Sequence, residues 1–255
     1  MMSRLVMKQA TKVVKNGLDE ERVLLDNVDL TIQPGEFITV VGGNGAGKST
    51  LFNTISGSLP LTRGKITINQ TDVTRKSEEQ RAKYIARVFQ DPKMGTAPRM
   101  TIAENLLLAE KRGQHRGLRP RKLQERLPDY KELCAQIGNG LEQHLDTPCG
   151  NLSGGQRQAL SLLMATLTTP ELLLLDEHTA ALDPKTSKNL MTLTNQLVTE
   201  QQLTCLMITH HMEDALQYGN RLILMKKGKI AKDLSQKEKE QLTLSDLLLF
   251  FESDL

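Results

Sequence analysis

The chain has 255 residues, of which 38% are hydrophobic and 25% charged, the balance of an ordinary globular protein. A net charge of +3 and an aromatic content of 3% argue against nucleic acid as a partner, because such a module needs a basic stripe or stacking aromatic rings. No apolar run approaches the roughly 20 residues that span a bilayer, and residues 1–12 lack the apolar centre of a signal peptide. Three widely spaced cysteines offer no disulfide framework. We therefore expect a cytosolic chain that reaches a membrane only through partners.

The N-terminal part, up to about residue 36, is expected to form strands and turns. Residues 27–32 alternate between polar and apolar side chains, which is typical of a half-buried strand. Pro34 and Gly35 predict a turn, and the apolar, β-branched run over residues 37–41 predicts a buried strand after it.

A glycine-rich stretch follows this strand and matches the phosphate-binding loop pattern G-x-x-x-x-G-K-[ST]. A helix predicted over residues 49–55, ended by Gly57, completes the strand–loop–helix context. Glycines let backbone N–H groups converge on phosphate oxygens, and the helix N-terminus adds its positive end. We expect Lys48 to reach the β- and γ-phosphates and Ser49 to ligate Mg²⁺. The predicted nucleotide-binding residues of this loop are Gly42, Gly43, Asn44, Gly45, Ala46, Gly47, Lys48, Ser49 and Thr50.

The middle of the chain is expected to contain a strand at residues 64–68 and helices from about residue 101 to 167. Basic side chains gather within residues 111–126. They are Lys111, Arg112, Arg116, Arg119, Arg121, Lys122 and Arg126. Contact with lipid headgroups or an anionic partner is one explanation, and a solvated loop and helix face is the one we favour.

The continuous leucine run at residues 172–175 is typical of a strand buried on both faces of a parallel sheet. Asp176 and Glu177 follow at its carboxyl end, where α/β sheets hold ligands. We expect Asp176 to hold Mg²⁺ and Glu177 to activate the water that attacks the γ-phosphate, a general-base role worth about 10²- to 10⁴-fold in rate.

Further strands are predicted at residues 203–208 and 221–225, with a helix over residues 185–198. Strands that alternate with helices indicate an α/β sheet. The charged and then apolar tail from about residue 235 is expected to form a short helix that packs on the core.

A second anion-binding stretch, Leu-Ser-Gly-Gly-Gln at residues 152–156, precedes an apolar helix from near Ala159. One chain has no obvious use for two such sites on one γ-phosphate, whereas two chains that face each other head to tail do. With a phosphate loop before it and an Asp-Glu strand after it, the stretch resembles the signature of the ATP-binding-cassette ATPases. The resemblance covers nearly the whole chain.

The resemblance implies an α/β P-loop NTPase fold, with a RecA-like core, an N-terminal antiparallel β region and an inserted helical subdomain. The expected organisation is a single domain, 1–255. Its core takes residues 1–92 and 166–235, the helical signature subdomain residues 93–165, and the C-terminal tail residues 236–255.

The resemblance also assigns roles to residues that spacing alone does not single out. Gln90 contacts Mg²⁺ or the lytic water, Asp183 acts across a dimer, and His210 grips the γ-phosphate. The implied catalytic residues are Glu177, His210, Gln90 and Lys48, and the implied metal ligands are Ser49, Gln90 and Asp176. The signature residues Ser153, Gly154, Gly155 and Gln156 contact the ATP that a second copy holds.

Two positions depart from the family pattern. Where the family often has an aromatic residue that stacks on adenine, this chain has Val14, so an aliphatic contact replaces stacking. His178 stands where the family usually has proline after the Asp-Glu pair. A histidine that titrates beside Glu177 would give the site some pH sensitivity.

The implied cofactors are ATP and Mg²⁺, and the implied partners are a second copy of the chain, integral-membrane permease subunits and a solute-binding protein. The chain would lie peripherally on the cytoplasmic face of the membrane. Residues 89–105 resemble uptake cassettes of the tryptophan/tyrosine or branched-chain amino-acid type. Two alternatives are a non-transport cassette in translation or DNA repair and a non-hydrolysing regulatory cassette, although an intact Glu177 and His210 argue against the latter.

Overall fold

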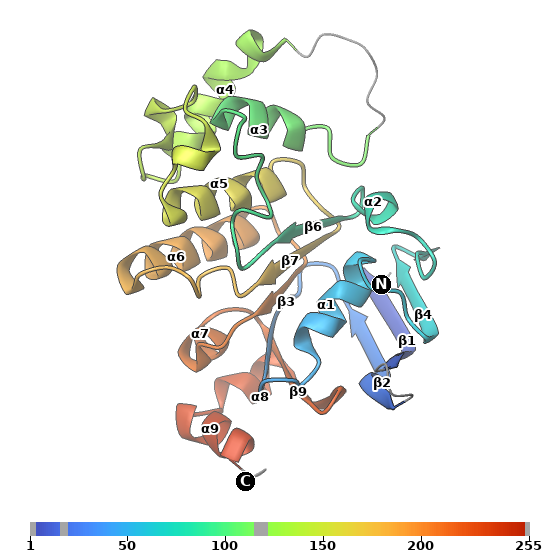
Figure 1. Cartoon of the computed structure of the whole chain (residues 1–255). Helices are drawn as coiled ribbons and strands as arrows, with labels where there is room; N and C mark the ends of the chain where they lie inside the picture. The colour runs from blue at the N-terminus through green and yellow to red at the C-terminus, as the bar shows by residue number, and fades with distance from the viewer. Residues whose placement is uncertain (1–3, 16–19, 115–121, 253–255) are drawn as a thin grey trace.

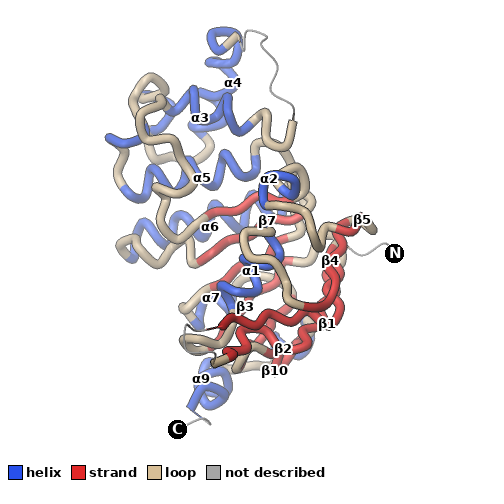
Figure 2. The backbone as a smooth tube through the Cα atoms, turned by 45° about the vertical axis from the view of Figure 1, so that its right-hand side comes forward, coloured by secondary structure: helices blue, strands red, loops and turns tan. Residues whose placement is uncertain are grey.

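The computed structural model describes residues 4–15, 20–114 and 122–252, which form two β-sheets and a set of helices (Figures 1 and 2). The larger sheet has the strand order β10-β9-β3-β8-β7-β6, in which only the edge strand β10 is antiparallel to its neighbour. Its strands are β3 (Phe37–Gly42), β6 (Ile85–Val88), β7 (Leu172–Asp176), β8 (Cys205–Ile208), β9 (Arg221–Lys226) and β10 (Lys229–Leu234).

The smaller sheet is antiparallel and has the order β2-β1-β4-β5. Its strands are β1 (Leu5–Lys15), β2 (Glu21–Ile32), β4 (Arg63–Ile68) and β5 (Thr71–Asp72). The alternation predicted in the first 36 residues therefore becomes a sheet whose apolar face is buried, with Val28, Leu30 and Ile32 all nearly inaccessible.

Most helices lie at the two ends of the larger sheet's layer, as Figure 1 shows. The helices α3 (Ile102–Ala109), α4 (Leu123–Ala135) and α5 (Gly154–Thr166) gather at one end, and α6 (Pro184–Glu200) lies between them and the strands. Towards the other end lie α7 (Met212–Gln217), α8 (Gln236–Glu240) and α9 (Leu244–Glu252). The remaining helices are α1 (Lys48–Ser56), which follows β3, and the short α2 (Glu78–Arg81). Two single-turn 3₁₀ helices cover Leu141–Gln143 and Cys149–Asn151.

The leucine run of β7 explains how the larger sheet is held between two layers. Leu173 and Leu175 pack in the cluster formed with α3, α5 and α6, whereas Leu172 and Leu174 pack in the cluster formed with α1 and the smaller sheet. Successive strand residues point to opposite faces, so a strand covered on both sides must be apolar at every position. The sequence prediction of a doubly buried strand is confirmed.

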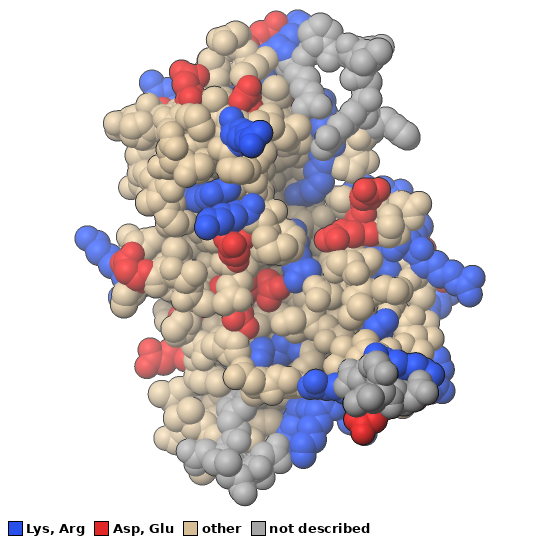
Figure 3. Space-filling view, in the orientation of Figure 1, with Lys and Arg blue, Asp and Glu red and all other residues tan. Residues whose placement is uncertain are grey.

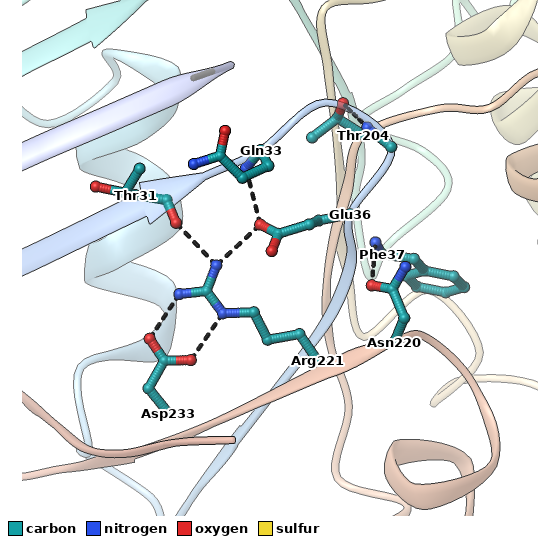
Figure 4. A network of polar contacts seen from close by, with 9 residues as sticks. Thr31, Gln33, Glu36, Phe37, Thr204, Asn220, Arg221 and Asp233 are labelled. Atoms are coloured by element: carbon teal, nitrogen blue, oxygen red, sulfur yellow. Dashed lines mark hydrogen bonds and ion pairs between the residues drawn. The ribbon is translucent and has the colours of Figure 1, made fainter. Parts of the chain in front are cut away.

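A polar network anchors the beginning of β3, the strand that leads into the glycine-rich loop (Figure 4). Arg221 donates two hydrogen bonds to Asp233 of β10, at 2.7 and 2.6 Å, and one of 2.8 Å to Glu36. Its hydrogen bonds to Asp233 are the main reason why the pKa of Arg221 lies above its usual value. Asn220 accepts a 3.0 Å hydrogen bond from the Phe37 N–H. These contacts tie the beginning of β3 to its neighbour β9 and, through Asp233, to the edge strand β10.

The predicted elements match the structure apart from their ends and the C-terminal tail. The strand predicted over residues 203–208 begins at Cys205, and the one over 221–225 continues to Lys226. We did not predict β10, whose side chains are mostly exposed and therefore lack a strong apolar pattern. The tail forms two helices, α8 and α9, rather than one, and Leu247 of α9 packs on the core as expected.

The described basic residues of the 111–126 segment mostly contact the chain itself. Arg112 donates to the carbonyl oxygens of Ala165 (2.6 Å) and Thr168, and Arg126 pairs with Glu110 and Asp129. Arg116, Arg119 and Arg121 lie outside the described residues. Figure 3 shows Lys and Arg interspersed with Asp and Glu on the face it draws, so no field of a single sign covers that face.

All three cysteines are buried and unpaired, and they lie at separate places in the core. Among the described residues, no helix has both the length and the apolarity needed to cross a bilayer.

Candidate nucleotide-binding site

The glycine-rich loop joins β3 to α1, and its shape depends on glycines that other residues cannot replace. Gly47 has φ of +102°, and a Cβ on it would lie 2.9 Å from the Leu24 carbonyl oxygen. A Cβ on Gly42 would lie 2.6 Å from the Met225 carbonyl oxygen. The exposed residues Gly43, Asn44 and Gly45 form the tip of the loop. Backbone N–H groups there and at the beginning of α1 provide the donors that a phosphate chain needs.

Lys48 is the first residue of α1, and its side chain reaches back into the loop. The residue is 6% exposed, and its ammonium donates hydrogen bonds to the carbonyl oxygens of Gly42 (2.6 Å) and Gly43 (3.2 Å). Burial lowers the pKa of Lys48, and the nearby carboxylates of Glu177 and Asp176 oppose that shift. A lysine that is held inside the loop and surrounded by acids is well placed to contact the terminal phosphates of a nucleotide.

The order of the parallel strands brings most of the predicted site residues together. The neighbours β3, β8, β7 and β6 all run in the same direction, so their carboxyl ends lie along one edge of the sheet. The loop with Lys48 follows β3, His210 follows β8, Asp176 and Glu177 end β7, and Gln90 follows β6. Adjacent carboxyl ends are where α/β sheets bind ligands.

Glu177 and His210 are in direct contact at this edge. His210 Nε2 lies 2.5 Å from Glu177 Oε1, within hydrogen-bonding distance. The Glu177 side chain is 13% exposed, whereas that of His210 is 43% exposed. Glu177 also has a left-handed backbone with φ of +48°, and its N–H donates a 3.0 Å hydrogen bond to the Ile208 carbonyl oxygen. The carboxylate is thus held beside His210, where β7 and β8 end.

Asp176 forms an ion pair that the sequence analysis missed. Arg87 of β6 lies 2.5 Å from the Asp176 carboxylate, donates a 2.8 Å hydrogen bond to the Asn53 side chain, and stacks over Phe89. The signal in the sequence is a single charged residue inside the otherwise apolar strand Ile85–Val88. Arg87 therefore connects the acid that ends β7 to α1 and to the residue before Gln90.

The predicted magnesium ligands are oxygen donors. Ser49 is exposed at the second residue of α1, Asp176 ends β7, and Gln90 is exposed beyond β6. Within the described ranges, no group of three or more His, Cys, Asp or Glu side chains is arranged to hold a metal ion. Hydroxyl, carboxylate and amide oxygens suit Mg²⁺, which binds few protein ligands and completes its shell with phosphate and water.

The signature residues lie elsewhere, at the N-terminus of α5. The Ser153 hydroxyl accepts a 3.2 Å hydrogen bond from the Gln156 N–H, and the Gln156 side chain accepts one from the Ser153 N–H. Gly155 is close to α6, because a Cβ on it would lie 2.4 Å from the Thr186 methyl carbon. The signature residues line a cavity of about 670 Å³ together with Asp183. No described residue of the phosphate loop lines this cavity, and neither Glu177 nor His210 does.

Val14 is half-buried near the end of β1 and faces Arg22 of β2 as its register partner. The Arg22 guanidinium lies 3.9 Å from where a Cβ on Gly45 would stand. Arg22 is not predictable from the sequence, since an exposed arginine in a strand carries no distinguishing signal. Arg22 therefore places a cation beside the phosphate loop, with the aliphatic Val14 as its register partner on β1.

His178 differs most from its predicted behaviour. Its side chain is buried, and burial lowers its pKa to about 4. The imidazole is therefore neutral at neutral pH. The less favoured alternative, a titrating His178 that gives the site pH sensitivity, does not hold near pH 7, because burial lowers the pKa of the ring to about 4.

The chain is similar to known proteins over most of its length. The family model described as ABC transporter matches residues 25–180, more than half of the chain. A tyrosine transport ATP-binding protein of Clostridioides difficile is 44% identical over 97% of this chain and 98% of its own length. A thiamine import ATP-binding protein of Yersinia pestis is 36% identical over 80% of this chain and 82% of its own length.

A solved structure supports the fold at the level of coordinates. The dimeric, post-hydrolysis ATP-binding cassette MJ0796 bound to ADP and Pi superimposes with a TM-score of 0.75 at 28% identity, over 91% of this chain and 98% of that one. The named relatives are transport proteins, so the comparison favours transport over the non-transport role that the sequence left open. The chain belongs to the ABC transporter family and is one of its ATP-hydrolysing cassettes.

Proposed function

We propose that this chain drives uptake of an amino-acid-like solute by hydrolysing ATP between two copies of itself, docked on separate membrane permease subunits at the cytoplasmic face. The observation that carries the proposal is the division of the site. One edge of the sheet gathers Lys48, Glu177 and His210, while Ser153 lines a different cavity of the same chain. A second copy that faces the first would bring its Ser153 to the nucleotide that Lys48 holds.

The chemistry that we assign to each residue follows from its surroundings. Lys48 and the loop N–H groups bind the phosphates, and Glu177 accepts the proton of the attacking water. His210, in contact with Glu177, orients that carboxylate and reaches the γ-phosphate. Ser49, Asp176 and Gln90 would hold Mg²⁺, which neutralises charge on the β- and γ-oxygens when it is bound.

The core at residues 1–92 and 166–235 and the helical subdomain at 93–165 would act as two bodies that close around ATP. A hydrogen bond between them supports this division. Gln158 of α5 donates a 2.8 Å hydrogen bond to the Phe89 carbonyl oxygen, next to Gln90. Motion of α5 would therefore change the position of Gln90. ATP hydrolysis would then depend on a conformational step that places Gln90.

The split site can be tested by mixing two inactive variants. Lys48→Ala loses its own phosphate contacts but keeps an intact signature, whereas Ser153→Arg keeps the phosphate loop and loses the signature. If the site is shared, mixing them restores one complete site in each mixed dimer, about a quarter of the wild-type ATPase rate. Each variant alone, at the same total concentration, is the control. A mixture no faster than the separate variants would contradict the shared site.

The transport role needs a separate experiment. A tagged chain purified from detergent-solubilised membranes should carry a multi-span membrane protein, and a preparation that carried ribosomes or DNA instead would refute transport. For the cargo, cells with the wild-type chain or Lys48→Ala should be compared for uptake of labelled tyrosine, thiamine and spermidine. We expect only tyrosine uptake to depend on Lys48, since the 44% identical relative is a tyrosine transport protein.

A further inference from the structure

The segment between Glu177 and Asp183 joins the two halves of the site within one chain. The segment begins at Glu177, just after β7, and ends at Asp183. The Asp183 side chain caps α6 by accepting a 3.1 Å hydrogen bond from the Thr186 N–H. Glu177 is left-handed at φ +48°. A non-glycine residue keeps such a backbone only where the surrounding structure holds it.

Among the described residues, the His178 side chain has one hydrogen-bond partner, Thr194, and both side chains are buried. Its Nε2 lies 2.9 Å from Oγ1 of Thr194, which is 0% exposed in the middle of α6. The Thr194 hydroxyl already donates its single proton to the Leu190 carbonyl oxygen at 2.8 Å. His178 Nε2 must therefore carry a proton and donate it to Thr194. The ring's tautomer is fixed by its neighbour.

This bond connects Glu177 to a rigid element. Thr194 lies about three turns along α6 from Asp183, on a helix that continues to Glu200. On the other side, the Glu177 N–H is held by the Ile208 carbonyl oxygen of β8. The left-handed Glu177 is thus held by β8 through its own N–H, and the next residue, His178, is tied to α6 by its hydrogen bond to Thr194.

We propose that His178 is a positioning residue, whose hydrogen bond to Thr194 keeps the Glu177 carboxylate in its reactive orientation and makes that orientation follow the position of α6. The N-terminus of α6, with Asp183 and Thr186, borders the signature cavity. A shift of α6 on dimer closure is thereby transmitted to Glu177. A proline at position 178 would fix its backbone through its ring, whereas the histidine does so through a side-chain bond. The proposal rests on the role proposed above for Glu177.

The test compares His178→Leu, which fills the space without a donor, with His178→Gln, whose Nε2 amide can still donate to Thr194. We expect His178→Leu to lower kcat about tenfold to a hundredfold, because a misplacement of about 1 Å in a catalytic group has effects of that size. KM and the Kd for a fluorescent ATP analogue should change less than about twofold, since the group acts on the chemical step and not on binding. His178→Gln should recover most of kcat.

Thr194 provides the matching half of the experiment, and Thr166 of α5 is its control. Both threonines are buried and donate to the carbonyl oxygen four residues earlier, but only Thr194 meets a histidine. Thr194→Val should lower kcat as His178→Leu does, Thr194→Ser should not, and Thr166→Val should leave kcat unchanged. The double variant His178→Leu/Thr194→Val should be no slower than either single one.

The outcomes separate this inference from the proposed function. If His178→Leu and Thr194→Val keep wild-type kcat while Glu177→Gln is inactive, His178 only fills space and the inference is wrong. If Glu177→Gln itself turns over ATP at the wild-type rate, the proposed role of Glu177 as the base is wrong, and so is the inference that rests on it. Should His178→Leu not fold, the decision rests on Thr194→Val, which replaces the hydroxyl with a methyl group, against Thr194→Ser, which keeps the hydroxyl and loses the methyl group.

Discussion

The phosphate-loop edge and the signature residues at the N-terminus of α5, which we propose both bind phosphate, are built in different ways. At the sheet edge, four parallel strands fix the positions of Lys48, Glu177 and His210, and each of these side chains contacts other groups of the site. At the signature, Ser153 satisfies the N-terminus of α5 and faces an open cavity. The phosphate-loop half of the site is therefore assembled within one chain. The signature half presents donors that we expect to contact the nucleotide held by a second copy.

We expect the largest effect on ATP hydrolysis from a change at the phosphate-loop edge of the sheet. Glu177→Gln removes the proposed base and should slow hydrolysis at least about 100-fold, the usual scale of general-base catalysis. ATP binding should persist, because the phosphate loop is untouched. A dimer trapped with ATP, visible as a doubled mass in light scattering, is the second expected outcome. A variant with near wild-type turnover would contradict the role of Glu177.

A change at the signature should slow hydrolysis without affecting ATP binding by the separate chain. Ser153→Arg places a bulky cation at the signature, and we expect hydrolysis to fall about 100-fold, comparable to losing one transition-state donor. Binding of ATP to the separate chain should be unchanged, because Ser153 lines no part of the phosphate loop. Equal loss of binding by the monomer, measured by titration with a fluorescent analogue, would mean that the two halves are not separate.

The backbone of the loop can be tested with a pair of glycines. Gly47→Ala forces a left-handed alanine whose Cβ lies 2.9 Å from the Leu24 carbonyl oxygen, and should cost about 1–3 kcal/mol of unfolding free energy. Gly35→Ala is the control, since Gly35 also has positive φ but has nothing within 4 Å of its Cβ position. It should cost only about 1 kcal/mol. Urea unfolding measures both, and equal costs would show that the close contact does not matter.

Near neutral pH the smallest effect comes from His178, because its contribution changes only when the pH falls below about 6.5. The pKa of His178 is about 4 in the fold and about 6.5 when unfolded, so the unfolded chain binds more protons between these values. Stability contributed by this group therefore falls as the pH drops from 6.5 to 4 and is constant above about pH 7, with a total of at most about 3 kcal/mol. His178→Gln should flatten that slope in urea unfolding. An unchanged slope would show that His178 is not the group responsible.

Whether the sequence predicted a feature depends on how far apart in the chain the interacting residues lie. The phosphate loop, the leucine strand and the Ser153 cap depend on neighbours within a few residues, so local patterns contain them. Gln90 and His210 needed a family resemblance, because only the order of β6, β7 and β8 places them at the same edge of the sheet as Glu177. Arg87, whose partners are Asp176 and Asn53, depends on pairing across the sheet that no local pattern predicts.

The burial of the three cysteines has a practical consequence. Thiol reagents attack the thiolate, and desolvation raises the pKa of Cys134 to about 12, of Cys149 to about 11, and that of Cys205 well above its usual value. All three should therefore stay unmodified in the folded chain at neutral pH. A cysteine introduced at an exposed position such as Asn44 would be the only one to take up a maleimide dye, so distances between loop and partner could be followed without first removing the native thiols.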